Sequence, residues 1–236
     1  MGATKSKWRG GQLAFYDGAT YETVEPFSPT VLYDDFFGTA VNTDFWTEVE
    51  LLDATKAIAA SVLTYHLHAT VEQEDAGIYG NDDLAWSIDK GCIFEARCDI
   101  AVLPTLLAEM HIGLQGEAHV ADDQVAAADD IDLHAFFVLD GSGAIVIYTD
   151  DGATDNDAVA TGITAVPGTY NIYRIDCTDP TNVLFYIDGA QVAATTTFDL
   201  SNGSMTFQPN IMATKSGGAG LGDINVDYIR VWQATR

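Results

Sequence analysis

The sequence predicts an all-β protein, built as an antiparallel two-sheet β-sandwich. Short segments rich in Val, Ile, Tyr, Phe and Thr recur about every 10–15 residues, and Gly, Asp, Asn or Pro turn signals separate them. No convincing amphipathic helix of ten or more residues is found. Because 47% of the residues are apolar, these half-apolar strands need a partner layer, and two facing sheets supply one.

The alternation of apolar and polar residues places each strand. In chain order the predicted strands are residues 12–16, 21–25, 46–52, 61–70, 91–102, 109–116, 133–140, 144–150, 169–177, 182–189, 190–198, 204–214 and 223–232. Asp188-Gly189 predicts a two-residue type I′ hairpin, because both residues accept positive φ angles. Asp17-Gly18 and Asp140-Gly141 predict similar turns, and Asp122–Asp130 is the best helical candidate.

Domain organisation and charge divide the chain into a short leader and a body. With 236 residues, six prolines and no Ser/Gly-rich tract, the chain predicts one main domain, 31–236, after an N-terminal arm, 1–30. Lys5, Lys7 and Arg9 give the first nine residues a positive charge, whereas the whole chain has a net charge of −25. Such an acidic surface repels phosphate and anionic lipid, so we expect neither nucleic acid nor membrane as a partner. No secretory signal or membrane span is recognised.

The three cysteines, Cys92, Cys98 and Cys177, have neither metal-binding spacing nor a disulfide framework. Cys92 and Cys98 are predicted on one strand, where six residues place them about 20 Å apart, too far to bridge. We therefore expect buried free thiols, which fit synthesis in a reducing cytoplasm.

Three segments of the body resemble a known family. They are 32–38 (LYDDFFG) with Phe45-Trp46, the hairpin 185–193 (FYIDGAQVA), and 221–232 (LGDINVDYIRVW). This pattern looks like the concanavalin A-like lectin/glucanase jelly roll and covers residues 31–236. The resemblance implies that the strand near residues 31–37 lies beside the last strand of the chain.

The leader carries a second resemblance. Residues 8–18 (WRGGQLAFYDG) are similar to the opening of uncharacterised structural proteins of tailed bacteriophages. This implies a virion decoration or head-associated protein, made in the host cytoplasm and displayed on the virion surface. In that case Lys5, Lys7, Trp8 and Arg9 would bind a major capsid protein or another virion subunit. The phage analogy, and no residue, suggests a homo-oligomer, in the first place a trimer.

An enzymatic role is not expected. Glucanases of this fold use two carboxylates on alternate positions of one strand, in the motif E-x-D-x-E or E-x-D-x-x-E. None of the acidic segments matches that motif, neither 48–50, 72–75, 95–99 nor 223–227. Glu95, Arg97 and Asp99 instead predict a solvated ion-pair ladder on one strand face.

One acidic segment is a candidate for metal binding. Asp151, Asp155 and Asp157 offer oxygen ligands of the kind that calcium prefers, but they lack the order of a known calcium loop. An Asp-rich β-turn is the simpler interpretation, so we expect no cofactor, with calcium as the open alternative. His66 and His68 are read as half-buried strand residues and not as zinc ligands.

Glycan binding is the alternative to the virion role, and the two are compatible. Lectin-like sandwiches hold sugars with aromatic rings, amides and carboxylates, and Tyr79, Trp86 and Asp82 could do so here. A large β-core also needs aromatic rings, so the same residues could be structural. We therefore expect first a non-enzymatic virion protein, second a carbohydrate-binding module, and third a glycosidase.

Overall fold

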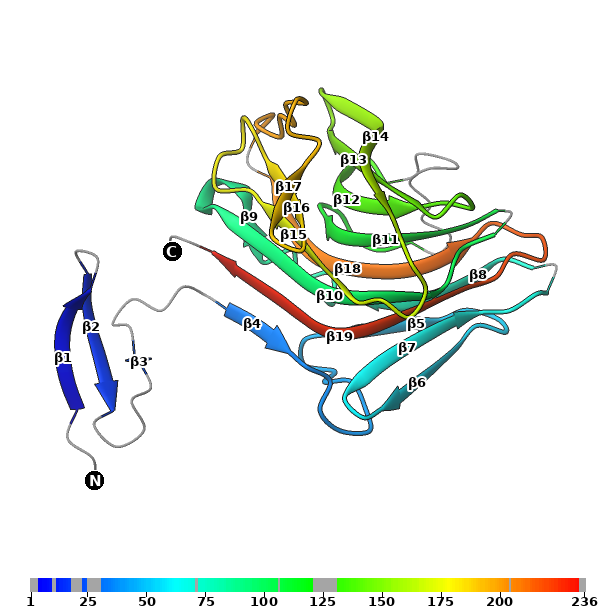
Figure 1. Cartoon of the computed structure of the whole chain (residues 1–236), viewed down its shortest axis with the longest axis horizontal. Coiled ribbons are helices and arrows are strands. Elements are labelled where there is room, and N and C mark those ends of the chain that lie inside the picture. The colour runs from blue at the N-terminus through cyan, green and yellow to red at the C-terminus, as the bar shows by residue number, and fades with distance from the viewer. Residues whose placement is uncertain are drawn as a thin grey trace.

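The structure is a computed structural model that describes residues 31–70, 72–105, 107–120, 131–203 and 205–233, together with the backbone of residues 4–9, 12–17 and 23–24. Two antiparallel sheets face each other, as Figure 1 shows. The all-β sandwich expected from the sequence is confirmed. In the described residues the one helical element is a 3₁₀ turn, Ile88–Lys90, and no helix is long and apolar enough to cross a membrane.

The first sheet, called the β19 sheet, contains the closing strand of the chain. Its order is β17 (Ala190–Val192), β16 (Leu184–Ile187), β15 (Asn171–Asp176), β10 (Cys92–Val102), β19 (Gly222–Gln233), β7 (Val62–Leu67) and β6 (Thr55–Ala59), with β4 (Val31–Asp34) also paired to β19. Residue Ile229 of β19 lies opposite Asp34 of β4. The predicted meeting of the strand near residue 31 with the last strand is therefore confirmed (Figure 1).

The second sheet, called the β18 sheet, faces the first. Its order is β14 (Asp155–Thr164), β13 (Ala144–Asp151), β12 (Leu133–Leu139), β11 (Ala108–Gln115), β18 (Thr206–Lys215), β8 (Glu74–Tyr79) and β5 (Thr47–Glu50), with β9 (Trp86–Ser87) also paired to β18. Because side chains alternate along each strand, one face of each sheet enters the core between them.

Aromatic rings fill the centre of that core. Phe137 of β12 lies 5.2 Å from the ring of Tyr173 and 5.3 Å from the ring of Phe185, both in an edge-on arrangement. Since Tyr173 and Phe185 belong to the β19 sheet, these contacts join the two layers. The three cysteines are buried and free, as the sequence predicted.

One of the three predicted turns is confirmed, and two are longer than predicted. Ile187 pairs with Ala190, and Asp188 and Gly189 have φ angles of 51° and 77°, so the two-residue hairpin is confirmed. The other two turns are longer than predicted. Residues 17–22 separate the paired Tyr16 and Thr23, and residues 140–144 separate the paired Leu139 and Ile145. At the second turn, Asp140 accepts hydrogen bonds from the backbone and hydroxyl of Ser142, and a wider loop satisfies that carboxylate.

The sequence did not predict several of the strands, among them the short β6 and β8 and the ten-residue β14. β14 contains Gly162 and two Thr residues but little apolar alternation, because it is an edge strand exposed along most of its length. The predicted ion-pair ladder also differs. Arg97 pairs with Asp227 of the neighbouring strand at 2.5 Å, while Asp99 accepts hydrogen bonds from Gly168 and Asn225.

The leader contains a small sheet of its own, β1 (Thr4–Arg9), β2 (Gln12–Asp17) and β3 (Thr23–Val24). Arg9 pairs with Gln12, so a hairpin begins earlier than the predicted one at Asp17-Gly18. Lys5, Lys7, Trp8 and Arg9 all lie on β1, and their side chains are outside the described part of the structure. The helix predicted for residues 122–130 falls outside the described residues as well.

Candidate functional site

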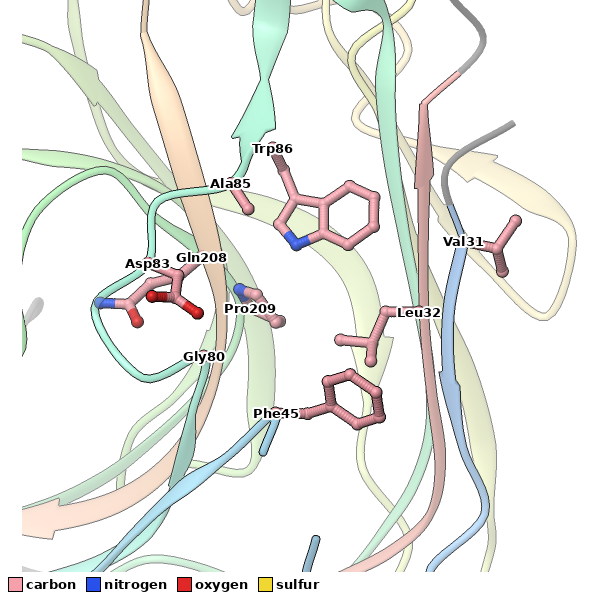
Figure 2. Close-up of a pocket in the computed structure, with 9 residues that line it drawn as sticks. All are labelled: Val31, Leu32, Phe45, Gly80, Asp83, Ala85, Trp86, Gln208 and Pro209. Carbon is pink, nitrogen blue, oxygen red and sulfur yellow. The ribbon is translucent and has the colours of Figure 1, made fainter. Parts of the chain in front are cut away.

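A pocket of about 190 Å³ opens at the mouth of the sandwich, where β4 meets the loop between β8 and β9 (Figure 2). Its lining is mainly apolar and comes from four separate segments of the chain: Val31, Leu32, Phe45, Gly80, Asp83, Ala85, Trp86, Gln208 and Pro209. An apolar pocket with a few polar groups is the usual form of a small-molecule site. Its volume suits one small ring or group.

The loop of residues 80–85 positions the polar side of this pocket. Asn81, Asp82 and Leu84 have φ angles of 58°, 59° and 41°, which lie in the left-handed region. Asn and Asp tolerate that region, whereas Leu84 is strained there at a cost of about 1–3 kcal/mol. Hydrogen bonds hold the loop in this shape. Thr47 donates to Asn81 at 2.7 Å, and the backbone N–H of Asp83 donates to the carbonyl of Gly80 at 3.1 Å.

Gln208 and Asp82 lock the same loop from the β18 side. The Gln208 amide nitrogen donates to Asp82 at 2.9 Å and to the carbonyl of Glu117 at 2.8 Å, and its oxygen accepts the backbone N–H of Asp82 at 3.0 Å. The Asp82 carboxylate also accepts the backbone N–H of His119 at 2.8 Å. Both side chains are therefore occupied in holding the loop, although Gln208 lines the pocket.

Two polar groups of the pocket remain free. Within the described residues, neither the indole N–H of Trp86 nor the carboxylate of Asp83 has a hydrogen-bond partner. Trp86 is 6% exposed, yet its ring nitrogen points into the pocket in Figure 2, and the Asp83 carboxylate points the same way from the opposite wall. The pocket thus offers one donor and one acceptor between apolar side chains.

The predicted glycan residues Tyr79, Asp82 and Trp86 lie close together in the chain but play different parts. Trp86 lines the pocket, Asp82 holds the loop, and Tyr79 faces the other side of the β18 sheet. The ring of Tyr79 lies against the ring of His119, with the centroids 4.7 Å apart and the planes tilted by 30°. Burial, with a contribution from Asp82, raises the pKa of Tyr79 above its ordinary value. The sequence missed Asp83, which only its place in the loop distinguishes from its neighbours.

The calcium candidates are not brought together. Asp151 accepts the backbone N–H groups of Ala153 and Thr154 with one oxygen and that of Asn202 with the other. Asp155 and Asp157 lie on β14, and Asp157 is exposed. In the part of the chain that the structure describes, no three His, Cys, Asp or Glu side chains are placed to hold a metal ion. The turn interpretation of Asp151 is confirmed.

A row of polar side chains lies on the outer face of the β18 sheet and was not predicted from the sequence. On β11 the outward positions are Glu109, His111, Gly113 and Gln115, and Asn210 of β18 donates to Gln115 at 2.6 Å. Their strict alternation with Met110, Ile112 and Leu114 was the available signal. Of these four positions only Glu109 carries an acid, so β11 has no pair of carboxylates on one face.

His111 is the unusual member of this row. It is fully buried, neither ring nitrogen has a hydrogen-bond partner in the described residues, and the ring stacks on Phe136 at 4.9 Å. Burial lowers the pKa of His111 to about 3, with smaller contributions from His119 and His134. The side chain is therefore a neutral imidazole at physiological pH.

Comparison with known proteins places the fold. The sequence matches no protein-family model and no curated protein. Among solved structures, the carbohydrate recognition domain of Emp47p superposes with a TM-score of 0.62 at 9% identity, covering 87% of this chain and 95% of that domain. The endo-β-1,3-glucanase from Pyrococcus furiosus gives 0.59 at 11% identity, covering 97% of each chain. A family 16 glycosyl hydrolase from Mycobacterium smegmatis gives 0.51 at 19% identity, covering 87% of this chain and 100% of that one.

This chain therefore has the jelly-roll fold that carbohydrate recognition domains and glucanases share. At such low identity the likeness concerns the fold alone. The fold implied by the resemblance of residues 31–236 to the concanavalin A-like proteins is confirmed.

Proposed function

We propose that this protein is a carbohydrate-binding protein without catalytic activity, and that it holds a neutral saccharide in the pocket of Figure 2. The observation that carries the proposal is the pairing of a free donor, Trp86, with a free acceptor, Asp83, in a mainly apolar pocket. Sugars present both hydroxyl groups and apolar C–H faces, so they match such a lining. The similarity to the Emp47p carbohydrate recognition domain supports this choice.

Electrostatics favour a neutral ligand. The chain has a net charge of −25, and Asp83 adds a negative charge inside the pocket. A sugar that carries a carboxylate or sulfate would be repelled both at long range and at the contact. A neutral sugar is not repelled by the negative charge of the protein. It also gains a hydrogen bond to an ionised acceptor, which is stronger than a bond between neutral groups.

A glycan array followed by calorimetry tests the proposal. We expect binding of neutral glycans by the full chain, and a loss of affinity of about tenfold or more in Asp83→Ala, because one charge-assisted hydrogen bond contributes about 1.5–3 kcal/mol. Asp89→Ala is the matched control, since Asp89 is also an exposed acid of this segment but does not line the pocket. An array without any hit would refute the proposal.

Binding without turnover is part of the proposal. The single acid among the outward positions of β11 supports it, because hydrolysis on this fold would need two carboxylates on alternate positions. Release of reducing ends from β-glucans or from any glycan that the array selects would contradict it.

The virion role stays a separate prediction. It depends on the leader sequence and on the charges of Lys5, Lys7 and Arg9. The similarities reported above concern proteins that bind or cleave glycans. The two roles are compatible, because a protein displayed on a particle can also bind sugar.

A further inference from the structure

The two free groups in the pocket have fixed and opposite hydrogen-bonding roles. The indole N–H of Trp86 can only donate, and the ionised carboxylate of Asp83 can only accept. A sugar hydroxyl can satisfy either one, so a plain hexose would fit without using this difference. A group with a carbonyl on one side and an N–H on the other uses it fully.

The apolar side chains add a third requirement. Leu32, Phe45 and Pro209 line the space beside the Trp86 ring (Figure 2). Water bound there would find few polar partners, so the lining favours a ligand with a small apolar group at this point. A hydroxymethyl or hydroxyl group would instead bury polar atoms against carbon.

Building on the proposed function, we propose that the pocket recognises the acetamido group of an N-acetylated amino sugar. The acetamido carbonyl accepts the hydrogen bond from Trp86, its N–H donates to Asp83, and its methyl group packs against Leu32, Phe45 and Pro209. Each of the three features of the pocket then has one counterpart in the ligand.

Size and charge agree with this assignment. A pocket of about 190 Å³ is smaller than the ~300–1,000 Å³ of pockets that enclose drug-sized ligands, so it accepts part of one sugar residue and leaves the rest of a glycan outside. The acetamido group is neutral, which suits a chain with a net charge of −25.

The rigidity of the loop makes the selection specific. The backbone of Asp83 is set by its bond to Gly80 and by the neighbours Asn81 and Asp82, and the Trp86 ring is 6% exposed, so its indole N–H is held by the surrounding side chains. A site built around fixed polar groups rejects ligands that leave those groups unpaired more strongly than an apolar pocket rejects a change of size.

Calorimetry with methyl glycosides tests the assignment on the full chain. The ligands are N-acetylglucosamine and N-acetylgalactosamine, their parent hexoses, and glucosamine, whose cationic ammonium group could pair with Asp83 but cannot accept the Trp86 N–H. We expect the N-acetylated sugars to bind about tenfold or more tighter than the hexoses. Asp83→Ala should abolish that preference, and Asp89→Ala should keep it.

A second measurement does not depend on the folding of a variant. In the wild-type protein labelled with ¹⁵N, the indole resonance of Trp86 should shift when N-acetylglucosamine is added and stay in place with glucose. The other three tryptophan resonances serve as internal controls.

The outcomes separate this inference from the proposed function. Equal binding of hexoses and N-acetylated sugars, lost in Asp83→Ala, would overturn the acetamido assignment and leave glycan binding in the pocket intact. Tightest binding of glucosamine would likewise overturn it in favour of amine recognition. Failure of every sugar and of the array would overturn both proposals.

Discussion

Replacement of Lys215 by Met tests the best-defined buried charge in the sandwich. Lys215 and Glu74 are both fully buried and lie 3.3 Å apart. The Lys215 ammonium also donates to the carbonyls of His68, Thr70 and Gly220, so it ties the end of β18 to the β7–β8 connection. Without it, the Glu74 carboxylate would remain buried without a compensating charge.

Removal of one partner from a buried ion pair costs about 3–5 kcal/mol. For a protein of this length each kcal/mol lowers Tm by about 2–4 °C, so we expect Lys215→Met to lower Tm by about 6–20 °C in differential scanning calorimetry. The double variant Lys215→Met/Glu74→Gln should recover much of this loss, because no charge is left buried.

Lys56→Met is the control. Lys56 pairs with Glu48 and Glu50, but its side chain is 30% exposed, so we expect a loss of no more than about 1 kcal/mol. A drop in Tm of less than about 2 °C for Lys215→Met, or a double variant less stable than the single one, would refute this account of the buried pair.

Three further predictions follow from the same structure. His111 has a pKa of about 3 in the folded protein and near 6.5 in the unfolded chain, so between these values only the unfolded chain binds the proton. As pH falls through this range, the free energy of unfolding should decrease by up to about 1.4 kcal/mol per pH unit. Urea unfolding of His111→Phe should show a flatter pH dependence than the wild type, and equal slopes would contradict this. Burial raises the pKa of the Cys98 thiol, and a hydrogen bond that the Cys177 thiol makes to Cys92, followed by burial, raises that of Cys177. A thiol-specific chromogenic disulfide should therefore label none of the three cysteines before unfolding and all of them in denaturant, and rapid labelling of the native protein would show that the core opens. Deletion of residues 1–11 should leave the sandwich folded by circular dichroism and abolish attachment to phage particles, and unchanged attachment would reject the leader as a docking segment.

The strands that the sequence predicted share one property. In β10, β12 and β19 the side chains either alternate between apolar and polar or are continuously apolar, because at least one face of each strand is buried. The residue types along these strands therefore show the burial directly. β14 is exposed on an edge and β6 is short, so neither needed an apolar pattern. The Asp188-Gly189 turn was predictable because its geometry depends on two adjacent residues, whereas the loop at Asp140 depends on how its carboxylate is satisfied.

The candidate site, in contrast, depends on contacts between residues that are distant in the sequence. Trp86 was a candidate as an aromatic residue near acids, but nothing in its neighbourhood separated Asp82 from Asp83. The two differ because Gln208, which is distant in the sequence, donates a hydrogen bond to the Asp82 carboxylate and none to that of Asp83. Leu32 joins the pocket because β4 pairs with the last strand, and Phe45 joins it from the turn before β5, which pairs with β8.

By itself, the sequence determined the fold class, the net negative charge, the free state of the three cysteines and the absence of a paired-acid motif, since these depend on composition and on patterns a few residues long. The tertiary structure alone decided which polar groups are occupied and which are free. A hydrogen-bond partner can come from any part of the chain, and only folding brings β4, the 80–85 loop and β18 to one place.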